Sequence, residues 1–200
     1  MNTILHILSI ILSYLLGAVP FGLLFAKAFS GVDVRTVGSR NIGATNVLRS
    51  AGKKAAIVTL LADMLKGFLP PIVVMLAFHE DYLSALSGAA AILGHNFPVF
   101  LGFKGGKGVA TSFGVILAVS PLIGVISLLV WLAAAYVWRY SSLSALLAFA
   151  LYPFFIFTMY PGSRPYGMLS LFIAGLIYAR HRENIKRLLA GTEPKIGEKK

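Results

Sequence analysis

The sequence predicts an all-α fold, namely a polytopic integral membrane protein with about seven transmembrane helices. Two observations support this prediction. Hydrophobic residues make up 58% of the 200 residues, charged residues make up only 12%, and the mean hydropathy is +0.82. Apolar runs long enough to cross a bilayer, which takes about 20 residues, also recur along the chain. Such a composition is typical of membrane proteins rather than of soluble domains.

Seven apolar runs alternate with polar loops. We expect spans at residues 4–29, 55–78, 82–103, 109–119, 121–138, 143–160 and 166–179. Pro20 predicts a kink or a close helix contact in the first run. The stretch 109–138 is too long for one span, so it is divided at Pro121, where a turn would fall. The second run carries Asp63 and Lys66 inside it.

The basic residues predict the orientation of these spans. With the N-terminus outside and seven spans, 16 of the 18 Lys and Arg residues face the cytoplasm, as does the C-terminus. Only Arg164 lies outside, and Lys66 lies within a span. We therefore attribute the net charge of +11 to membrane topology. No nucleic-acid partner is expected, because no nucleic-acid-binding motif accompanies the charge.

The composition also excludes several kinds of chemistry. The chain has no cysteine, which excludes thiol nucleophiles, Cys-based zinc sites and disulfides. None of its four histidines has the spacing of a metal site, and no Ser–His–Asp arrangement is visible. We therefore expect no metal and no cofactor.

The loop at residues 33–54, DVRTVGSRNIGATNVLRSAGKK, has the composition of half an anion site. Five basic residues stand against the single acid Asp33, with polar side chains placed among glycines. Glycines let backbone amides approach a ligand, hydroxyls and carboxamides hydrogen-bond it, and arginines bind phosphate bidentately. The residues with this chemistry are Ser39, Asn41, Gly43, Thr45, Asn46 and Arg49.

A second polar segment, FKGGKGVATS at residues 103–112, is a glycine-rich turn that leads into a helix. Free amides and the positive end of a helix dipole suit a phosphate. The candidate contacts are Lys104, Gly105, Gly106, Lys107, Gly108 and Thr111. The segment is not a P-loop, because Leu101 and Gly108 break that motif. A flexible basic turn that touches lipid headgroups is the alternative.

The third polar segment, ARHRENIKRLLAGTE at residues 179–193, is expected to be helical. Arg180, His181 and Asn184 would then lie on one face and could contact the same ligand. The alternative is an amphipathic helix that anchors the C-terminus at the membrane surface. Across the three segments there is hardly a carboxylate, which predicts a pocket for one or two phosphates beside a membrane.

Three ionisable residues are expected in or beside the membrane. Asp63 and Lys66 are three residues apart on a helix and can satisfy each other as a buried ion pair, although such residues also mark functional sites. His95 stands near the cytoplasmic end of the third span, where it could contact the glycine-rich turn. The alternative is a histidine that only satisfies a helix end.

Several motifs together resemble the bacterial acyl-phosphate:glycerol-3-phosphate acyltransferases, the PlsY family. They are GSRNIGATNVLR, DMLKG, GHNFPVFLGFKGGKGVAT, RYSSL and RHRENIKRLLAGTE, in order and at family-like spacing. The resemblance ends at Glu193, and Arg40 departs from it where Gly is more usual. It implies a monomeric inner-membrane enzyme with one domain, residues 1–193. Its cytoplasmic loops 30–54, 103–108 and 139–142 would form the site, followed by a basic tail, 194–200.

The resemblance also implies the reaction and the role of each site residue. A fatty acyl group would pass from acyl phosphate directly to glycerol 3-phosphate, giving lysophosphatidic acid, without an acyl-enzyme. The residues with catalytic roles would be Ser39, Arg49, Lys107, His181 and Asn184. The phosphate-binding residues would be Asn41, Gly43, Thr45, Asn46, Lys104, Gly105, Gly106, Gly108, Thr111 and Ser142. The supporting residues would be Asp63, Lys66, His95 and Arg139.

Two questions stay open at this point. The proton acceptor is either His181 or a phosphate oxygen of the substrate, and the resemblance favours the phosphate. A membrane transporter for a phosphorylated anion would use a similar basic pocket, but nearly all polar residues lie on one face of the predicted membrane protein. A scaffold with headgroup-binding loops leaves the Gly, Asn and Thr pattern unexplained.

Overall fold

The computed structural model describes residues 2–198, and this part of the chain forms nine α-helices and one short 3-10 helix without any strand. The first elements are α1 (Asn2–Ala18), α2 (Phe21–Ser30), α3 (Ala44–Phe78), α4 (Asp81–Asn96) and the 3-10 helix η1 (Val99–Leu101). They are followed by α5 (Val109–Val119), α6 (Pro121–Trp138), α7 (Ser141–Met159), α8 (Arg164–Arg180) and α9 (Arg182–Leu189). The predicted all-α fold is confirmed.

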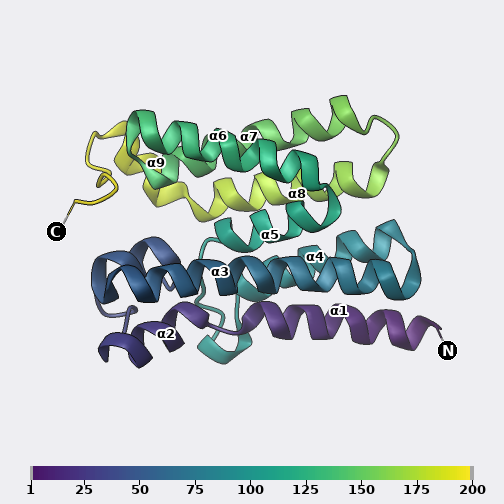
Figure 1. Cartoon of the computed structure of the whole chain (residues 1–200), viewed down its shortest axis with the longest axis horizontal. Coiled ribbons are helices and arrows are strands. Elements are labelled where there is room, and N and C mark those ends of the chain that lie inside the picture. The colour runs from purple at the N-terminus through teal and green to yellow at the C-terminus, as the bar shows by residue number, and fades with distance from the viewer. Residues whose placement is uncertain (1, 199–200) are drawn as a thin grey trace.

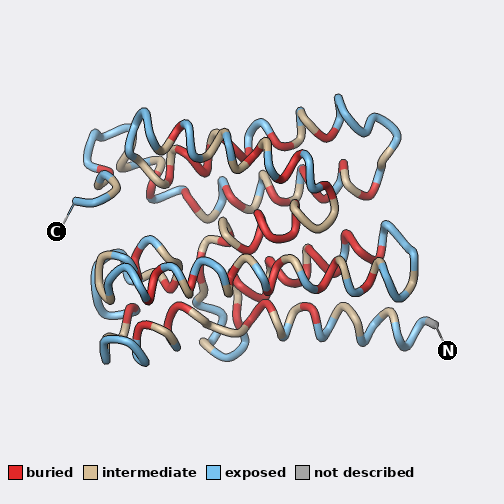
Figure 2. The backbone as a smooth tube through the Cα atoms, in the orientation of Figure 1, coloured by how far each residue is buried: buried red, intermediate tan, exposed pale blue. Residues whose placement is uncertain are grey.

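The helices form two layers that run side by side (Figure 1). Helices α1 to α4 make one layer, α6 to α8 make the other, and the short α5 lies between them. The two termini lie at opposite ends of the bundle, with α9 and the loops after α2, α4 and α6 toward the C-terminal end. Figure 2 shows that burial is densest around α4 and α5, where the two layers meet.

Five helical stretches are long and apolar enough to cross a membrane. They are Thr3–Ser30, Ala44–Phe78, Asp81–Leu101, Pro121–Trp138 and Ser141–Met159. Helix α5 has 11 residues and is about 16 Å long, too short to cross the hydrocarbon core alone. Helix α8 has 17 residues and runs alongside α7. The count of seven spans includes these two, and it stays a prediction.

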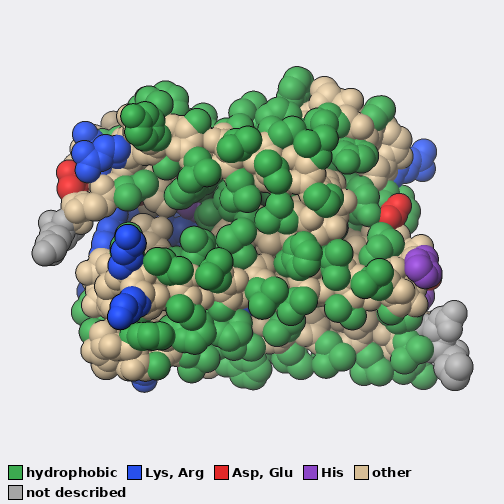
Figure 3. Space-filling view, viewed as in Figure 1, with side chains coloured by type: hydrophobic (Ala, Val, Ile, Leu, Met, Phe, Trp, Pro, Cys, Tyr) green, Lys and Arg blue, Asp and Glu red, His purple; other side chains and the backbone are tan. Residues whose placement is uncertain are grey.

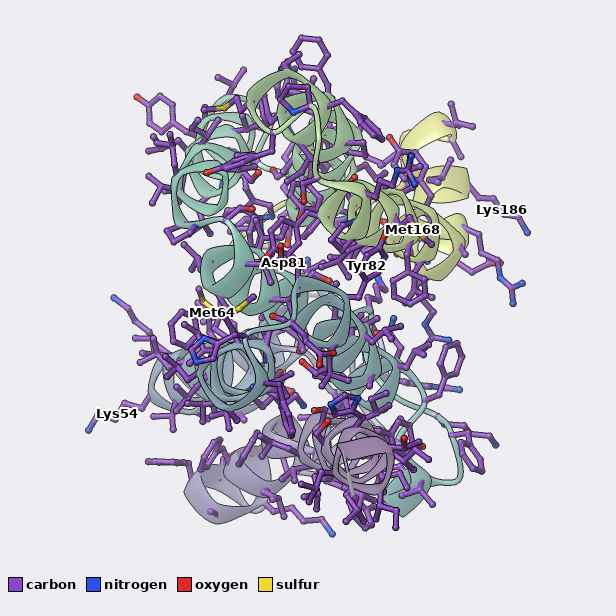
Figure 4. The ribbon with its side chains drawn as sticks, turned by 90° about the vertical axis from the view of Figure 1, so that its right-hand side faces the viewer. Lys54, Met64, Asp81, Tyr82, Met168 and Lys186 are labelled. Atoms are coloured by element: carbon purple, nitrogen blue, oxygen red, sulfur yellow. The ribbon has the colours of Figure 1, made fainter. Side chains whose placement is uncertain are left out.

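The surface has the charge distribution of a membrane protein. In Figure 3 hydrophobic side chains cover the middle of the visible face, and charged side chains gather at its two ends. Figure 4 looks along the bundle from one end and shows Lys54 and Lys186 reaching outward on opposite sides. Many large apolar side chains are exposed, among them Leu61, Leu129 and Phe154. An exposed apolar band of this extent fits a lipid environment.

Glycines bring α5 into close contact with α3. A Cβ on Gly67 would meet the backbone of Thr111, and one on Gly114 would meet the backbone of Met64. Small residues of this kind let membrane helices pack backbone to backbone. Because α5 is fixed in this way, the glycine-rich turn that precedes it is also held against the rest of the bundle.

Some helix boundaries differ from those expected. The first apolar run breaks at Pro20, as predicted. Helix α3 already begins at Ala44, with a non-helical residue at Gly52 (φ 87°), so the loop expected at 33–54 is partly helical. Helix α4 ends at Asn96 rather than near residue 103, because Pro98 disfavours helical backbone at the residue before it.

Candidate active site

The loop between α2 and α3 is held together by the side chain of Asn46. Its Nδ2 donates to the carbonyls of Val34 (2.9 Å), Val37 (3.2 Å) and Asn41 (2.9 Å), and its Oδ1 accepts from the amide of Ser39 (2.9 Å). The residue is 2% exposed. Both ends of this carboxamide are therefore occupied by the loop itself, and Asn46 shapes the loop rather than offering a free group to a phosphate.

Two other features fix the path of the same loop. The Oδ1 of Asn41 accepts from the amide of Gly43 (2.8 Å), just before α3 begins. Arg40 has φ 56°, in the left-handed region that favours glycine. Glycine adopts this backbone conformation without strain, which gives a physical reason for the glycine that the resemblance leads us to expect at position 40. The side chains of Ser39 and Thr45 remain exposed, and Thr45 Oγ1 lies 3.3 Å from Ser141 Oγ.

The glycine-rich turn is bound from two directions. The Gly106 amide donates to the His95 carbonyl (3.0 Å). The Arg180 guanidinium donates to the carbonyls of Gly105 (3.1 Å) and Gly106 (2.9 Å), and it stacks on the Phe97 ring (5.1 Å). The expected contact of the Gly106 amide with a phosphate is wrong for this structure, because that amide already has its partner.

The third polar segment is two helices rather than one. Helix α8 ends at Arg180, α9 begins at Arg182, and His181 lies at the junction. The expectation that Arg180 and Asn184 share one helix face is wrong, because the two residues belong to different helices, α8 and α9. Both still contact the glycine-rich turn, Arg180 through the Gly106 carbonyl and Asn184 through Lys107. The His181 ring is 3% exposed, and its Nδ1 lies 2.8 Å from the carbonyl of Ile177.

Glu193 is the centre of the most tightly connected part of the site. Its Oε1 accepts from Ser142 Oγ (2.6 Å) and Asn184 Nδ2 (2.7 Å), and its Oε2 accepts from Arg187 Nε (2.7 Å). Asn184 Oδ1 in turn accepts from Lys107 Nζ. We call Lys107, Ser142, Asn184, Arg187 and Glu193 the Glu193 cluster. The expectation of a site with hardly a carboxylate is wrong at this position.

Residues after Glu193 are part of the same surface. Arg49 Nη2 lies 3.4 Å from the carbonyl of Pro194, the Ile196 amide donates to the Arg139 carbonyl (2.6 Å), and Arg139 Nη2 donates to the Ile196 carbonyl (3.2 Å). The described part of the expected basic tail therefore packs against the loops that carry Arg49 and Arg139. Through these contacts the segments expected to form the site meet at one end of the bundle.

Burial and neighbouring charges shift two pKa values at this end. Burial lowers the pKa of Lys107 to about 8, although Glu193 opposes the shift. Burial, together with the Lys107 charge, lowers the pKa of His181 to about 4. At neutral pH the lysine is therefore mostly charged and the imidazole is neutral. The hydrogen bonds to Glu193 outweigh its burial and keep its pKa below the ordinary value.

Of the remaining candidate residues, one is exposed and the others are buried. Lys104 is exposed on the glycine-rich turn, whereas Thr111 is fully buried at the contact between α3 and α5. The expected ion pair is confirmed, with Lys66 Nζ 2.8 Å from Asp63 Oδ1 and both residues 2% exposed. His95 also reaches the glycine-rich turn, as expected, since its carbonyl accepts from Gly106.

Taken together, the site is basic and polar and is suited to binding phosphate. Arg49, Lys107, Arg180 and Arg187 surround it, and their charges can neutralise a dianion. Within residues 2–198, no group of three His, Asp or Glu residues is placed to hold a metal ion. Sequence reasoning missed Glu193 as a site residue, although it ends the AGTE segment that the resemblance included.

Comparisons with known proteins agree with this geometry. The family model described as "Glycerol-3-phosphate acyltransferase" matches residues 7–191. The glycerol-3-phosphate acyltransferase of Dinoroseobacter shibae is 53% identical over 188 residues, which cover 94% of this chain and 91% of that protein.

Two solved structures are also similar to this chain. Both are crystal structures of PlsY, described as an integral membrane glycerol 3-phosphate acyltransferase. The glycerol 3-phosphate form gives a TM-score of 0.91 at 44% identity and covers 96% of each chain. The lysophosphatidic acid form gives 0.89 at 43% identity, covering 96% of this chain and 95% of that one. The chain therefore belongs to the glycerol-3-phosphate acyltransferase family.

Proposed function

We propose that this protein transfers a fatty acyl group from acyl phosphate to the 1-hydroxyl of glycerol 3-phosphate, giving lysophosphatidic acid and phosphate. The observation that carries the proposal is the meeting of Arg49, Lys107 and Asn184 at one end of an apolar helix bundle. Both the acceptor and the donor carry a phosphate that such a site can bind. The PlsY structures in glycerol 3-phosphate and lysophosphatidic acid forms support the acceptor and the product.

The donor is inferred from the chemistry that the site can supply. The chain has no cysteine, and no motif for an activated serine is visible in it. Acyl phosphate is a mixed anhydride whose phosphate is already a good leaving group, so it needs no covalent enzyme intermediate. In the proposed step the glycerol hydroxyl oxygen bonds to the acyl carbon, the bond from that carbon to the phosphate oxygen breaks, and phosphate departs with the electron pair.

The charged residues act on this step through binding and electrostatics. Arg49 and Lys107 neutralise phosphate charge, and Lys107 stabilises the charge that grows on the departing phosphate. Ser39 and Asn184 orient the substrates, so that the hydroxyl is held against the acyl carbon. The further phosphate contacts that we propose come from Thr45, Lys104 and the amides of Gly105 and Gly108.

We assign the hydroxyl proton to a phosphate oxygen of the substrate. His181 is the competing acceptor, but burial lowers its pKa to about 4 and its Nδ1 lies 2.8 Å from the Ile177 carbonyl. A general base works best when its pKa is near the operating pH. A phosphate oxygen, with a second pKa of about 6, is the stronger base at neutral pH.

The acyl chain reaches the site from the lipid side. Figure 3 shows a hollow between the two helix layers, toward the C-terminal end, with basic side chains inside and hydrophobic side chains around it. We propose that this end faces the cytoplasm of a bacterial cell and that the protein crosses the inner membrane with seven spans. We also propose that the enzyme acts as a monomer.

A transfer assay on the detergent-purified protein tests this proposal. Phosphate release from palmitoyl phosphate is measured with and without glycerol 3-phosphate, and palmitoyl-CoA is tested in parallel as the donor. We expect release only when glycerol 3-phosphate is present, with palmitoyl-CoA inactive. Transfer from palmitoyl-CoA would overturn the proposal that acyl phosphate is the donor. No transfer by folded protein would favour a transporter, which uptake of labelled glycerol 3-phosphate into proteoliposomes would test.

A further inference from the structure

The His95 ring packs so closely against Gly106 that no side chain fits at position 106. A Cβ added to Gly106 would lie far inside van der Waals contact with His95 Nε2, and its three nearest atoms all belong to the His95 ring. Gly106 is not among the glycines with positive φ, so its backbone does not itself call for glycine. The imidazole is therefore what excludes a side chain at position 106.

The His95 ring in turn lies beside the buried ion pair of Asp63 and Lys66. Its Nδ1 lies 3.6 Å from Asp63 Oδ1, and Lys66 Nζ lies 2.8 Å from the same oxygen. Lys66 Nζ also donates to the Val19 carbonyl (2.8 Å), so the pair is tied to the break between α1 and α2. His95, Asp63 and Lys66 are each at most 3% exposed. The ring thus lies beside the buried carboxylate, at a distance longer than a hydrogen bond.

Gly106 is enclosed on three sides. The His95 ring covers its Cα, the His95 carbonyl accepts from its amide at 3.0 Å, and Arg180 donates to its carbonyl at 2.9 Å. Lys107 follows directly and places its ammonium against Asn184. Any displacement of Gly106 therefore moves Lys107, the group that stabilises the departing phosphate in the proposed reaction.

We propose that His95 is a positioning residue for phosphate binding. Packed beside the ion pair of Asp63 and Lys66, its ring fills the space next to Gly106 and so sets the position of the Lys107 ammonium. The ring does not act as a proton acceptor, because it is buried and its Nε2 faces Gly106. This inference rests on the proposed role of Lys107 in binding substrate phosphate.

A double-mutant cycle between His95 and Gly106 tests the inference. The variants are Gly106→Ala, His95→Asn and the two combined, assayed for kcat and for KM toward glycerol 3-phosphate. Asparagine keeps a donor that can face Asp63 but removes the far end of the ring. Gly175→Ala is the matched control, since Gly175 has open space around it and no positive φ.

We expect Gly106→Ala to raise KM at least tenfold and His95→Asn to raise it by a smaller factor. The combined variant should raise KM at least fivefold less than the product of the two single effects, because the added methyl group then has room. Gly175→Ala should leave KM unchanged. Single effects that simply multiply would overturn the inference, as would an unchanged KM in His95→Asn.

Two further measurements separate a folding defect, or a failure of the proposed reaction, from a failure of the positioning role. The unfolding midpoint of each variant is measured, and if His95→Asn does not fold, Asp63→Asn replaces it, since that change loosens the ring and should also raise KM. Acyl transfer by the wild-type protein is measured in parallel. If the wild-type protein transfers acyl groups but the cycle is multiplicative, the positioning role fails while the proposed reaction stands.

Discussion

The two parts of the site differ in how many short hydrogen bonds they make within the protein. One part is the Glu193 cluster, and the other is the α3 side, which carries Ser39, Thr45 and Arg49. In the Glu193 cluster, three donors lie 2.6–2.7 Å from the Glu193 carboxylate, and Ser142, Asn184 and Glu193 are buried. On the α3 side, Arg49 and Thr45 make only contacts of 3.3–3.4 Å, and Ser39 and Thr45 are exposed.

This difference separates residues that hold the fold as well as serve the ligand from residues that serve the ligand alone. The Glu193 cluster has its hydrogen bonds satisfied within the protein, so it is preorganised around Lys107. The Arg49 side chain makes one long contact within the described chain, 3.4 Å to the Pro194 carbonyl, so its guanidinium is available to bind a phosphate. We therefore expect changes in the cluster to lower both stability and activity, and changes on the α3 side to lower activity alone.

The largest expected effect is that of Lys107→Ala. In the proposed reaction the ammonium stabilises the departing phosphate, and removing one preorganised donor of this kind typically costs about 100- to 1000-fold in rate. Phosphate release from palmitoyl phosphate measures the loss. Arg164→Ala at the other end of the bundle is the control and should be nearly silent. Equal losses in the two variants would show that the charge is not acting in the site.

A smaller loss of activity, with a clear loss of stability, is expected for Glu193→Gln. The substitution keeps the shape of the side chain but removes the charge that pairs with Arg187 and accepts from Ser142 and Asn184. A buried acceptor that loses its charge leaves its donors poorly satisfied. The unfolding midpoint should fall by several degrees, because the cluster links α7, α9 and the C-terminal segment. An unchanged midpoint would mean that the cluster does not hold these segments together.

The pH dependence of kcat/KM should report the protonation of Lys107. A lysine binds phosphate in its protonated form, and its pKa of about 8 means that the charge is lost as the pH rises above that value. The ratio kcat/KM should therefore fall about tenfold per pH unit above pH 8. Lys107→Arg keeps its proton in this range, so its activity, even if low, should not show that decline. The same alkaline decline in both variants would assign it to another group.

The smallest expected effect is that of a chelator. The described residues offer no cluster of metal ligands, and arginine and lysine side chains supply the charge around the site. Transfer activity in EDTA should match that in buffer. A loss that added Mg²⁺ restores would contradict this expectation and would indicate a metal bound together with the substrate phosphates.

The sequence predicted the helices better than the connections between them. Apolar runs and prolines located the helices after Pro20 and Pro121, because helix breaks at prolines depend on local sterics. The break at His181 was not predicted, since nothing in RHRENIK interrupts a helical pattern. It follows from tertiary contacts, with Arg180 bonded to the glycine-rich turn and His181 buried.

The site was predicted in its residue types more than in their roles. Basic and glycine-rich segments on one predicted face indicated that Arg49, Lys107 and Asn184 would meet, because residues near one membrane surface share a thin layer. The use of Asn46 within its own loop and the position of Glu193 could not be predicted, since both depend on which partners the fold places within hydrogen-bond distance.

The most direct test of this comparison is to measure the unfolding midpoint and the transfer rate of Arg49→Ala on one preparation. If the α3 side is open and serves the ligand, the rate should fall by about 100-fold or more while the midpoint stays within about 1 °C of the wild type. A midpoint that falls by several degrees, as expected for Glu193→Gln, would contradict the account. Arg49 would then belong to the assembled half of the site, through its contact with Pro194.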